Sequence, residues 1–338
     1  MRPRLTPVMA DARRAVREKF EELSLAPGDR ILVAASGGAD STALAAACAF
    51  EGAKAGILVA GAIVDHGLQS GSHEIAQQAQ KRLVAIGLDP VAIEQVTVAV
   101  RGEGLEAAAR EVRYAALERA RRLVDAKWIF LGHNLDDQAE TVLLGLSRGS
   151  GLRSISGMPS VDESRRLVRP LLGMPRAELR QACIDQELEF WDDPHNLDDR
   201  FLRVKVRNLA NILEEALGPG FAPSLARTAQ SAALADDLIS QLARTSEQQA
   251  RLAGSSTSVE YSIEELNSLH PAVRLQTLHL MLQQASGKSI SSSQVAEVDA
   301  LITNWHGQKP LSLPGITVER VASALVVKKN QKLTPGAC

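Results

Sequence analysis

The chain has 338 residues, of which 45% are apolar and only 3% aromatic, and its formal net charge is −2. This length predicts two domains with aliphatic cores, and the near-neutral charge argues against a uniformly basic nucleic-acid-binding surface. The three cysteines are far apart in the sequence, at Cys48, Cys183 and Cys338. This spacing disfavours a disulfide framework or a cysteine-built zinc site. It is typical of proteins in a reducing cytoplasm.

No stretch reaches about 18 uninterrupted apolar residues, so we expect no transmembrane helix. The beginning of the chain carries Arg13, Arg14 and Arg17 but no apolar core segment, so it does not look like a secretory signal. We therefore expect a cytoplasmic protein that has no membrane partner.

The first half of the chain alternates apolar runs of strand length with segments of helical periodicity. An amphipathic helix is expected over 8–23, and strands over 30–35, 57–64, 91–98 and 128–131. Further helices are expected over 43–50, 75–88, 105–124 and 135–146. This alternation predicts an α/β fold with a doubly wound, mostly parallel sheet that binds ligands at the carboxyl ends of its strands.

A glycine-rich segment joins the first strand to the next helix and reads Ser36-Gly37-Gly38-Ala39-Asp40-Ser41. Its glycines let a ligand approach the backbone, and the start of the helix offers unpaired N–H groups to an anion. Asp40 would repel a bound phosphate unless a cation lay between them, so we expect Asp40 to face Mg²⁺. The less favoured alternative is an ordinary turn in which Asp40 is the helix N-cap.

Two further polar clusters precede residue 120. Asp65 and His66 follow the strand at 57–64, where they would coordinate metal or position adenosine, or merely cap the next helix. Arg110, Arg113 and Tyr114 share one face of the helix at 105–124. That face suits a phosphate or a stacked base, and a solvated face with Glu–Arg pairs is nearly as well supported.

A fourth cluster begins where the strand at 128–131 ends. His133 and Asn134 lead into a helix that carries Asp136, Asp137 and Glu140 in its first two turns. Acidic residues in a first turn are ordinary capping, but a second Asp and a Glu one turn later exceed that need. We therefore favour a metal and cationic-substrate site at this position.

Beyond Gly149 the periodicity weakens and positive charge accumulates, with seven arginines against three acidic residues between 148 and 180. Helices are expected over 175–187, 202–217 and 225–252, within 263–284, and over 295–303, with a small hairpin within 311–327. The glycines and prolines of 218–223 predict a domain boundary. It separates a catalytic domain at 1–217 from a smaller, mainly helical domain at 218–338.

Taken together, these motifs resemble the tRNA(Ile)-lysidine synthetases, a family of PP-loop ATP pyrophosphatases. The resemblance runs from about Arg30 to Asn208 and rests on the motifs at 36–41, 64–68, 106–114 and 132–141, in the family's order and spacing. The segments at 148–152, 169–172 and 193–196 are similar to the family's later signatures. One departure is Arg203-Val204-Lys205-Val206-Arg207, where the family usually has Arg-Asn-Arg-Ile-Arg.

The resemblance implies a ligase that modifies the wobble cytidine of the CAU-anticodon isoleucine tRNA. Such an enzyme transfers AMP from ATP to the C2 oxygen of the cytosine, releases diphosphate, and lets free L-lysine displace the AMP. By this resemblance, residues 36–41 bind ATP, and Asp40 and Asp137 hold Mg²⁺. The implied catalytic set also contains Asp65, Arg113, His133, Asp136 and Glu140, with Arg113 on the intermediate's phosphate and Asp136 or Glu140 on the lysine ammonium.

The positive segment after residue 147 is expected to bind phosphates of the anticodon stem, through Arg148, Arg169, Arg203, Lys205 and Arg207. The second domain would assist in tRNA recognition. Two alternatives stay open: another PP-loop tRNA-modifying enzyme, such as a thiolase with catalytic cysteines, and a non-catalytic tRNA-binding protein. The sequence does not fix the oligomeric state, and a homodimer is one option.

Overall fold

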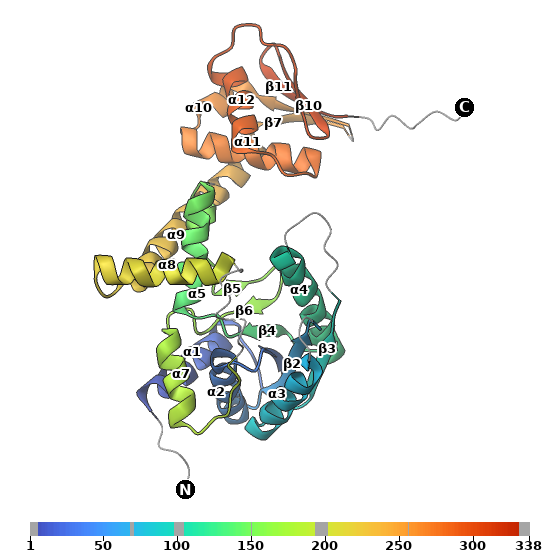
Figure 1. Cartoon of the computed structure of the whole chain (residues 1–338). Helices are drawn as coiled ribbons and strands as arrows, with labels where there is room; N and C mark the ends of the chain where they lie inside the picture. The colour runs from blue at the N-terminus through green and yellow to red at the C-terminus, as the bar shows by residue number, and fades with distance from the viewer. Residues whose placement is uncertain are drawn as a thin grey trace. The chain divides into compact units, whose positions relative to one another are not determined.

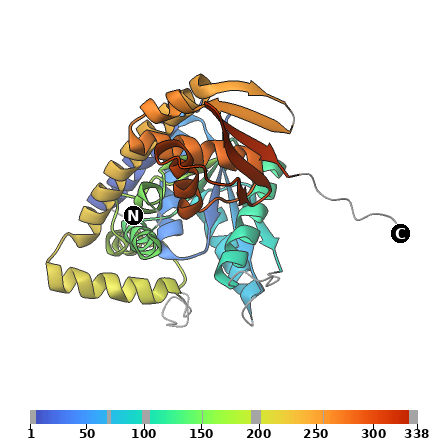
Figure 2. The same ribbon diagram turned by 90° about the horizontal axis from the view of Figure 1, so that it is seen from above.

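The computed structural model describes residues 6–67, 71–97, 105–149, 151–192, 202–255 and 257–330. The chain divides into two compact units, one comprising 1–149 and 154–230, the other 150–153 and 231–338. This division falls inside a long helix, α9 (Phe221–Ala250), which begins within the segment 218–223 at which we expected a boundary. Figure 2 shows α8 (Leu202–Leu217) and α9 joined through this short turn.

The first unit is built on a six-stranded sheet of order β3-β2-β1-β4-β6-β5. The first five strands in this order run parallel, and the edge strand β5 pairs antiparallel with β6. The strands are β1 (Arg30–Ala35), β2 (Leu58–Asp65), β3 (Val91–Gln95), β4 (Trp128–Leu131), β5 (Val161–Asp162) and β6 (Leu167–Val168). The predicted doubly wound, mostly parallel sheet is confirmed, although β5 and β6 were not predicted.

Alternate residues of β1 enter two different cores, which explains why the whole strand is apolar. Ile31 and Val33 pack with α1 (Pro7–Glu22), α2 (Ala39–Ala55), α3 (Ser72–Ile86) and α7 (Arg176–Asp185). Leu32 and Ala34 pack on the opposite face with Leu117 of α4 (Leu105–Leu123). Figure 1 shows these helices around the sheet, and α5 (Leu135–Arg148) follows β4.

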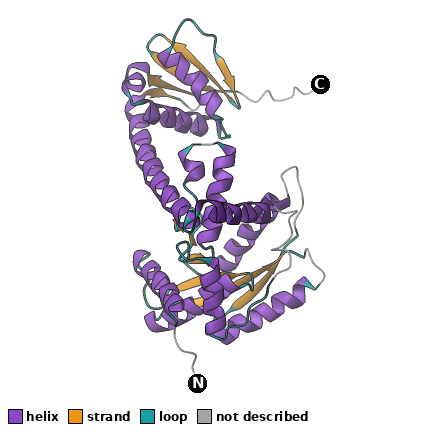
Figure 3. Cartoon of the chain, turned by 60° about the vertical axis from the view of Figure 1, so that its left-hand side comes forward, coloured by secondary structure: helices purple, strands orange, loops and turns teal. Residues whose placement is uncertain are grey.

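The second unit has the expected helices and a five-stranded antiparallel sheet of order β7-β8-β11-β10-β9 (Figure 3). Its strands β10 and β11 pair as the hairpin expected within 311–327. Its helices are α10 (Ile263–Ser268), α11 (Pro271–Ser286) and α12 (Ser292–Thr303); its strands are β7 (Arg251–Gly254), β8 (Ser258–Ser262), β9 (Leu311–Leu313), β10 (Ile316–Val321) and β11 (Ala324–Lys329). Leu278, Val298 and Val318 are fully buried in one core between helices and sheet. The four-residue helix α6 (Leu152–Ile155) completes the described elements. None of the described helices is long and apolar enough to cross a membrane.

Gly132 lies where the chain leaves β4 and passes the first turn of α2. A Cβ atom at this residue would lie 3.0 Å from the Cα of Ser41 and 3.1 Å from the carbonyl carbon of Asp40. Both neighbours are backbone atoms, so neither can rotate away. The missing side chain of Gly132 therefore lets the end of β4 lie against the start of α2.

We expect Gly132→Ala to lower the free energy of unfolding by about 1–3 kcal/mol, because the added methyl group overpacks a backbone contact. The control is Gly173→Ala, since a Cβ at Gly173 meets nothing within 4 Å. Its free energy of unfolding should stay within about 0.5 kcal/mol of wild type. Urea unfolding of the three proteins measures both values, and equal stability of the two variants would contradict the role given to Gly132.

Candidate active site

Three of the four predicted polar clusters lie at the carboxyl ends of β1, β2 and β4, which are adjacent strands of the sheet, and the remaining one lies on α4. The glycine-rich loop follows β1, Asp65 ends β2, and His133 and Asn134 follow β4. Parallel strands place such residues along one edge, so segments that are far apart in the sequence face a common space.

The glycine-rich loop is held by hydrogen bonds among its own residues. The backbone N–H of Ser36 donates to Oγ of Ser41 over 3.2 Å, and that hydroxyl donates to the carbonyl of Gly38 over 3.0 Å. Gly37 has a φ of +83°, which favours glycine. The N-cap of α2 is Gly38, with no side-chain cap, so the alternative in which Asp40 caps this helix is wrong.

Asn134 and Asp137 fix the start of α5 by a reciprocal capping box. Oδ1 of Asn134 accepts from the backbone N–H of Asp137 over 2.9 Å, and Oδ2 of Asp137 accepts from that of Asn134 over 3.1 Å. Asp137 thus does serve as a cap of α5, as the simpler interpretation expects, whereas Asp136 accepts from the backbone N–H of Arg176. Asp137 still directs its other oxygen, Oδ1, toward the site.

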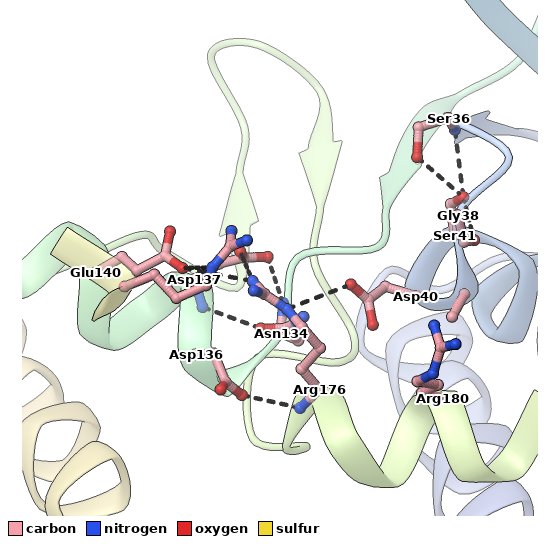
Figure 4. Close-up of polar contacts among 12 residues, drawn as sticks. Ser36, Gly38, Asp40, Ser41, Asn134, Asp136, Asp137, Glu140, Arg176 and Arg180 are labelled. Carbon is pink, nitrogen blue, oxygen red and sulfur yellow. Dashed lines mark hydrogen bonds and ion pairs between the residues drawn. The ribbon is translucent and has the colours of Figure 1, made fainter. Parts of the chain in front are cut away.

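Arg176, at the start of α7, lies among the acidic residues (Figure 4). Its Nη2 donates to Oδ1 of Asp137 over 2.6 Å and lies 3.5 Å from Oε1 of Glu140, and its Nε lies 3.8 Å from Oδ2 of Asp40. Its backbone N–H donates to Oδ2 of Asp136 over 2.8 Å. One arginine therefore connects four of the five predicted carboxylates, and Asp65 is the one that it does not contact in these pairs.

Glu140 is the most buried of these acids, with 2% of its side chain exposed. Its Oε1 accepts from Nε of Arg207 over 2.8 Å, whereas its buried Oε2 has no hydrogen-bond partner in the described part of the chain. Burial raises the pKa of Glu140, and Arg207 opposes that rise. This unpartnered oxygen could accept a hydrogen bond from a cationic ligand.

Asp40 is also short of partners. Within the described residues its buried Oδ1 accepts no hydrogen bond. Burial raises the pKa of Asp40 to about 6, while Arg176 opposes the shift and Asp137 adds to it. A carboxylate oxygen without a partner, next to a second carboxylate, is a donor set that fits Mg²⁺, which commonly binds one or two carboxylates together with substrate phosphates and water.

A pocket of about 220 Å³ adjoins the end of β4, lined chiefly by His66, Arg110, Arg113, Tyr114, His133 and Arg203. Burial lowers the pKa of His133 well below its usual value, and the neighbouring Arg169 and Arg113 lower it further. His133 is therefore neutral, while the arginines stay charged. The pocket suits an anion next to an aromatic ring.

Asp65 mainly shapes the turn after β2. Its Oδ1 accepts from the backbone N–H of Gly67 over 3.0 Å, and Oδ2 lies 3.8 Å from Nδ1 of His73. The adjacent His66, and not Asp65, lines the pocket.

The five residues predicted to bind tRNA fall into separate groups. Arg169 is 4% exposed and its Nη1 donates to the carbonyl of Pro159 over 2.7 Å, so these contacts do not favour the phosphate contact predicted for it. Arg207 contacts Glu140, and Arg203 lines the pocket. Arg148 and Lys205 are exposed.

Some residues of the predicted motifs lie outside the described residues. These are the motif at 193–196, Ser150 of the motif at 148–152, and Leu68 of the motif at 64–68.

The sequence analysis counted Arg176 among the seven arginines of the positive segment at 148–180, which was expected to bind RNA. Its contacts in the structure are instead with carboxylates. Its position after Pro175, at the first residue of α7, was visible in the sequence. What the sequence does not give is that this helix end lies next to α5, because the contact joins residues about forty positions apart.

Residues 10–214 match the PP-loop domain family, and residues 262–326 match the TilS substrate binding domain family. A tRNA(Ile)-lysidine synthase from Leifsonia xyli is 47% identical over 88% of this chain and 89% of the relative. The corresponding protein of Streptomyces coelicolor is 45% identical over 89% and 85%. That of Rhodococcus erythropolis is 42% identical over 98% and 96%.

Among solved structures, the first unit's architecture is similar to that of a U34-tRNA thiolase, NcsA, from Methanococcus maripaludis. The TM-score is 0.56 with 19% sequence identity, over 66% of this chain and 78% of the thiolase. At this identity the likeness concerns the fold alone.

The raised pKa of Asp40 predicts a pH-dependent stability. Since its pKa rises from 3.8 to about 6 on folding, the folded protein binds the proton more tightly, and the wild type loses up to about 2 kcal/mol as the pH rises from 4 to above 6. Asp40→Asn removes this loss. We expect the variant to be more stable than wild type at pH 7.5 and equally stable near pH 4.

Urea unfolding at several pH values in EDTA measures this difference. Asp192→Asn is the control, because a hydrogen bond from Arg180 lowers the pKa of the exposed Asp192. That variant should gain no stability at pH 7.5. A pH-independent difference between Asp40→Asn and wild type would contradict the prediction.

Proposed function

The chain belongs to the tRNA(Ile)-lysidine synthase family, and we propose that it joins L-lysine to C2 of the wobble cytidine of the CAU-anticodon isoleucine tRNA. The cytosine O2 attacks the α-phosphorus of ATP and diphosphate leaves. The lysine amine then attacks C2, and the C2–O bond breaks to release AMP. The observation that carries this proposal is the meeting of a PP-loop, a carboxylate cluster and an arginine-lined pocket at one edge of the sheet.

The glycine-rich loop would hold the phosphates of ATP. The first turn of α2 begins at Ala39 without a side-chain cap, and its positive dipole end attracts an anion. Gly37 and Gly38 leave the backbone accessible, and the Ser36–Ser41 hydrogen bond keeps the loop in shape. The loop can thereby bind the diphosphate as it leaves.

Asp40 and Asp137 would hold Mg²⁺, with Oδ1 of Asp40 as the oxygen that still lacks a partner in the described chain. The ion would neutralise charge that develops on the leaving diphosphate. The two carboxylates come from the starts of α2 and α5, which Gly132 lets approach closely.

The pocket at the end of β4 would take the adenylated cytidine. Arg113 and Arg110 supply charge for the phosphate of the intermediate, and Tyr114 supplies an aromatic face. The target base lies in a single-stranded anticodon loop, so it can be unstacked into a pocket at limited cost. His133, neutral through burial, can accept or donate a hydrogen bond without adding charge.

Glu140 is the better of the two predicted residues for binding the lysine ammonium. Its buried Oε2 has no partner in the described chain, whereas Oδ2 of Asp136 already accepts from the backbone of Arg176. A buried carboxylate gains more from a cation than an exposed one, because the surrounding dielectric constant is low.

The thiolase alternative is not favoured, because the cysteines that the structure describes are unsuited to sulfur transfer. Cys48 and Cys183 are both buried. Burial raises the pKa of the Cys183 thiol to about 12 and that of Cys48 further, so neither forms the reactive thiolate at neutral pH.

Mass spectrometry of the tRNA product tests the proposed function. With ATP, Mg²⁺ and L-lysine, the CAU-anticodon isoleucine tRNA should gain the mass of lysine less one water at the wobble cytidine, while AMP and diphosphate accumulate. Asp40→Ala should abolish turnover and leave tRNA affinity nearly unchanged, because Asp40 contacts metal and not RNA. Release of ADP and phosphate, or an unchanged tRNA mass with wild type, would refute the proposal.

Lys205 is the clearest surface contact for tRNA phosphates, because it is exposed on α8, where Arg203 and Arg207 turn toward the site. We expect Lys205→Ala to reduce the salt-dependence slope of tRNA binding by about one unit or less, through lost counterion release. Affinity for ATP should not change. The control is Lys54→Ala, which removes a lysine at the opposite end of α2 from the loop; equal slopes for both variants would contradict the assignment.

A further inference from the structure

Arg176 has no assigned part in the proposed reaction, yet it is the side chain that brings the acidic residues together. Its guanidinium contacts Asp137 at 2.6 Å, Glu140 at 3.5 Å and Asp40 at 3.8 Å, and 26% of the side chain is exposed. These partners come from α2 and α5, whereas Arg176 begins α7. The contact therefore spans three separate elements (Figure 4).

Among the described residues, Arg176 forms ion pairs with Asp40, Asp137 and Glu140, and its backbone N–H donates to Asp136. Arg207 pairs with Glu140. Without Arg176, Asp40 and Asp137 would thus face one another with little compensating charge, which is unfavourable in a partly buried site.

We propose that Arg176 is a positioning residue that occupies the cation position between Asp40 and Asp137 before Mg²⁺ binds. When the ion binds, Arg176 loses its contact with Asp40 and keeps its hydrogen bond to Asp137. This inference rests on the proposed function, since the Mg²⁺ site is part of it.

The unequal contacts of Arg176 determine which one is released. The Asp137 contact is a short, charge-assisted hydrogen bond, whereas Asp40 lies beyond hydrogen-bond distance at 3.8 Å. The buried Oδ1 of Asp40 has no partner among the described residues, so it is an unused acceptor for a cation, whereas Oδ2 faces Arg176. In the substrate-free site the ion must therefore compete with the guanidinium of Arg176 for Asp40, the weaker of its two contacts.

Binding of Mn²⁺ alone, followed by electron paramagnetic resonance without ATP or tRNA, tests the proposal. Arg176→Ala removes the competing charge, so Mn²⁺ should bind about five- to tenfold more tightly than to wild type. The variant should also melt at a lower temperature than wild type in EDTA, and added Mg²⁺ should restore most of the loss. Arg176→Lys keeps the charge and should bind Mn²⁺ within about twofold of wild type.

Arg180→Ala is the matched control. Arg180 lies one turn further along α7 and pairs with the exposed Asp192, away from the acidic cluster. Its Mn²⁺ affinity and its response to Mg²⁺ should equal those of wild type. If Arg176→Ala does not fold, Arg176→Gln removes the charge while retaining a polar side chain, and the same tightening is expected.

Unchanged or weaker Mn²⁺ binding by the Arg176 variants would overturn the proposal, as would a melting-temperature loss that Mg²⁺ does not reverse. Because the measurements need no turnover, they separate this inference from the function itself. If the wild type forms lysidine but the Arg176 and Arg180 variants bind Mn²⁺ with the same affinity, only the role of Arg176 is refuted. If the variants differ in Mn²⁺ affinity as expected but the wild type forms no lysidine, only the proposed function is refuted.

Discussion

The arrangement of the site depends on bringing like charges together at the edge of the sheet. Asp40 and Asp137 start different helices, and Arg176 contacts both, which offsets their repulsion. Steric requirements act in the same direction, because Gly132 removes the side chain that would push α2 away from the end of β4. Charge and packing thus both favour the observed arrangement of these segments.

Two neighbouring residues divide the site into regions of opposite charge. His133 lines a pocket with Arg110, Arg113 and Arg203, whereas Asn134 caps the helix that carries Asp137. Since the end of β4 passes between these regions, an anionic intermediate and a cationic amine can be bound close together without sharing ligands. A reaction in which an amine displaces a phosphate ester needs this separation, because a carboxylate beside the phosphate would weaken its binding.

The sequence alone predicted the four longest strands and most helices of the first unit, because these depend on local patterns. The apolar run 30–35, the two glycines and the periodicity of the helices specify the sheet and its loop through short-range chemistry. Strands β7 and β8 were missed because Arg251–Gly254 and Ser258–Ser262 have little apolar content and are stabilised by pairing with each other and with β11. The role of Arg176 was missed for a similar reason, since its partners are distant in the sequence.

The positive segment at 148–180 shows why a charge count cannot locate an RNA-binding surface. Arg169 is buried with a hydrogen bond to Pro159, Arg176 binds carboxylates, and Arg180 pairs with Asp192. A guanidinium presents five donors and is weakly hydrated, so it is the cation most often used inside a protein to join acidic and carbonyl groups. An excess of arginine therefore indicates a positive surface only when the arginines that have partners inside the protein are left out of the count. In this chain, leaving them out moves the expected phosphate contacts from Arg169 and Arg207 to exposed residues such as Lys205, whose compact ammonium group remains in water.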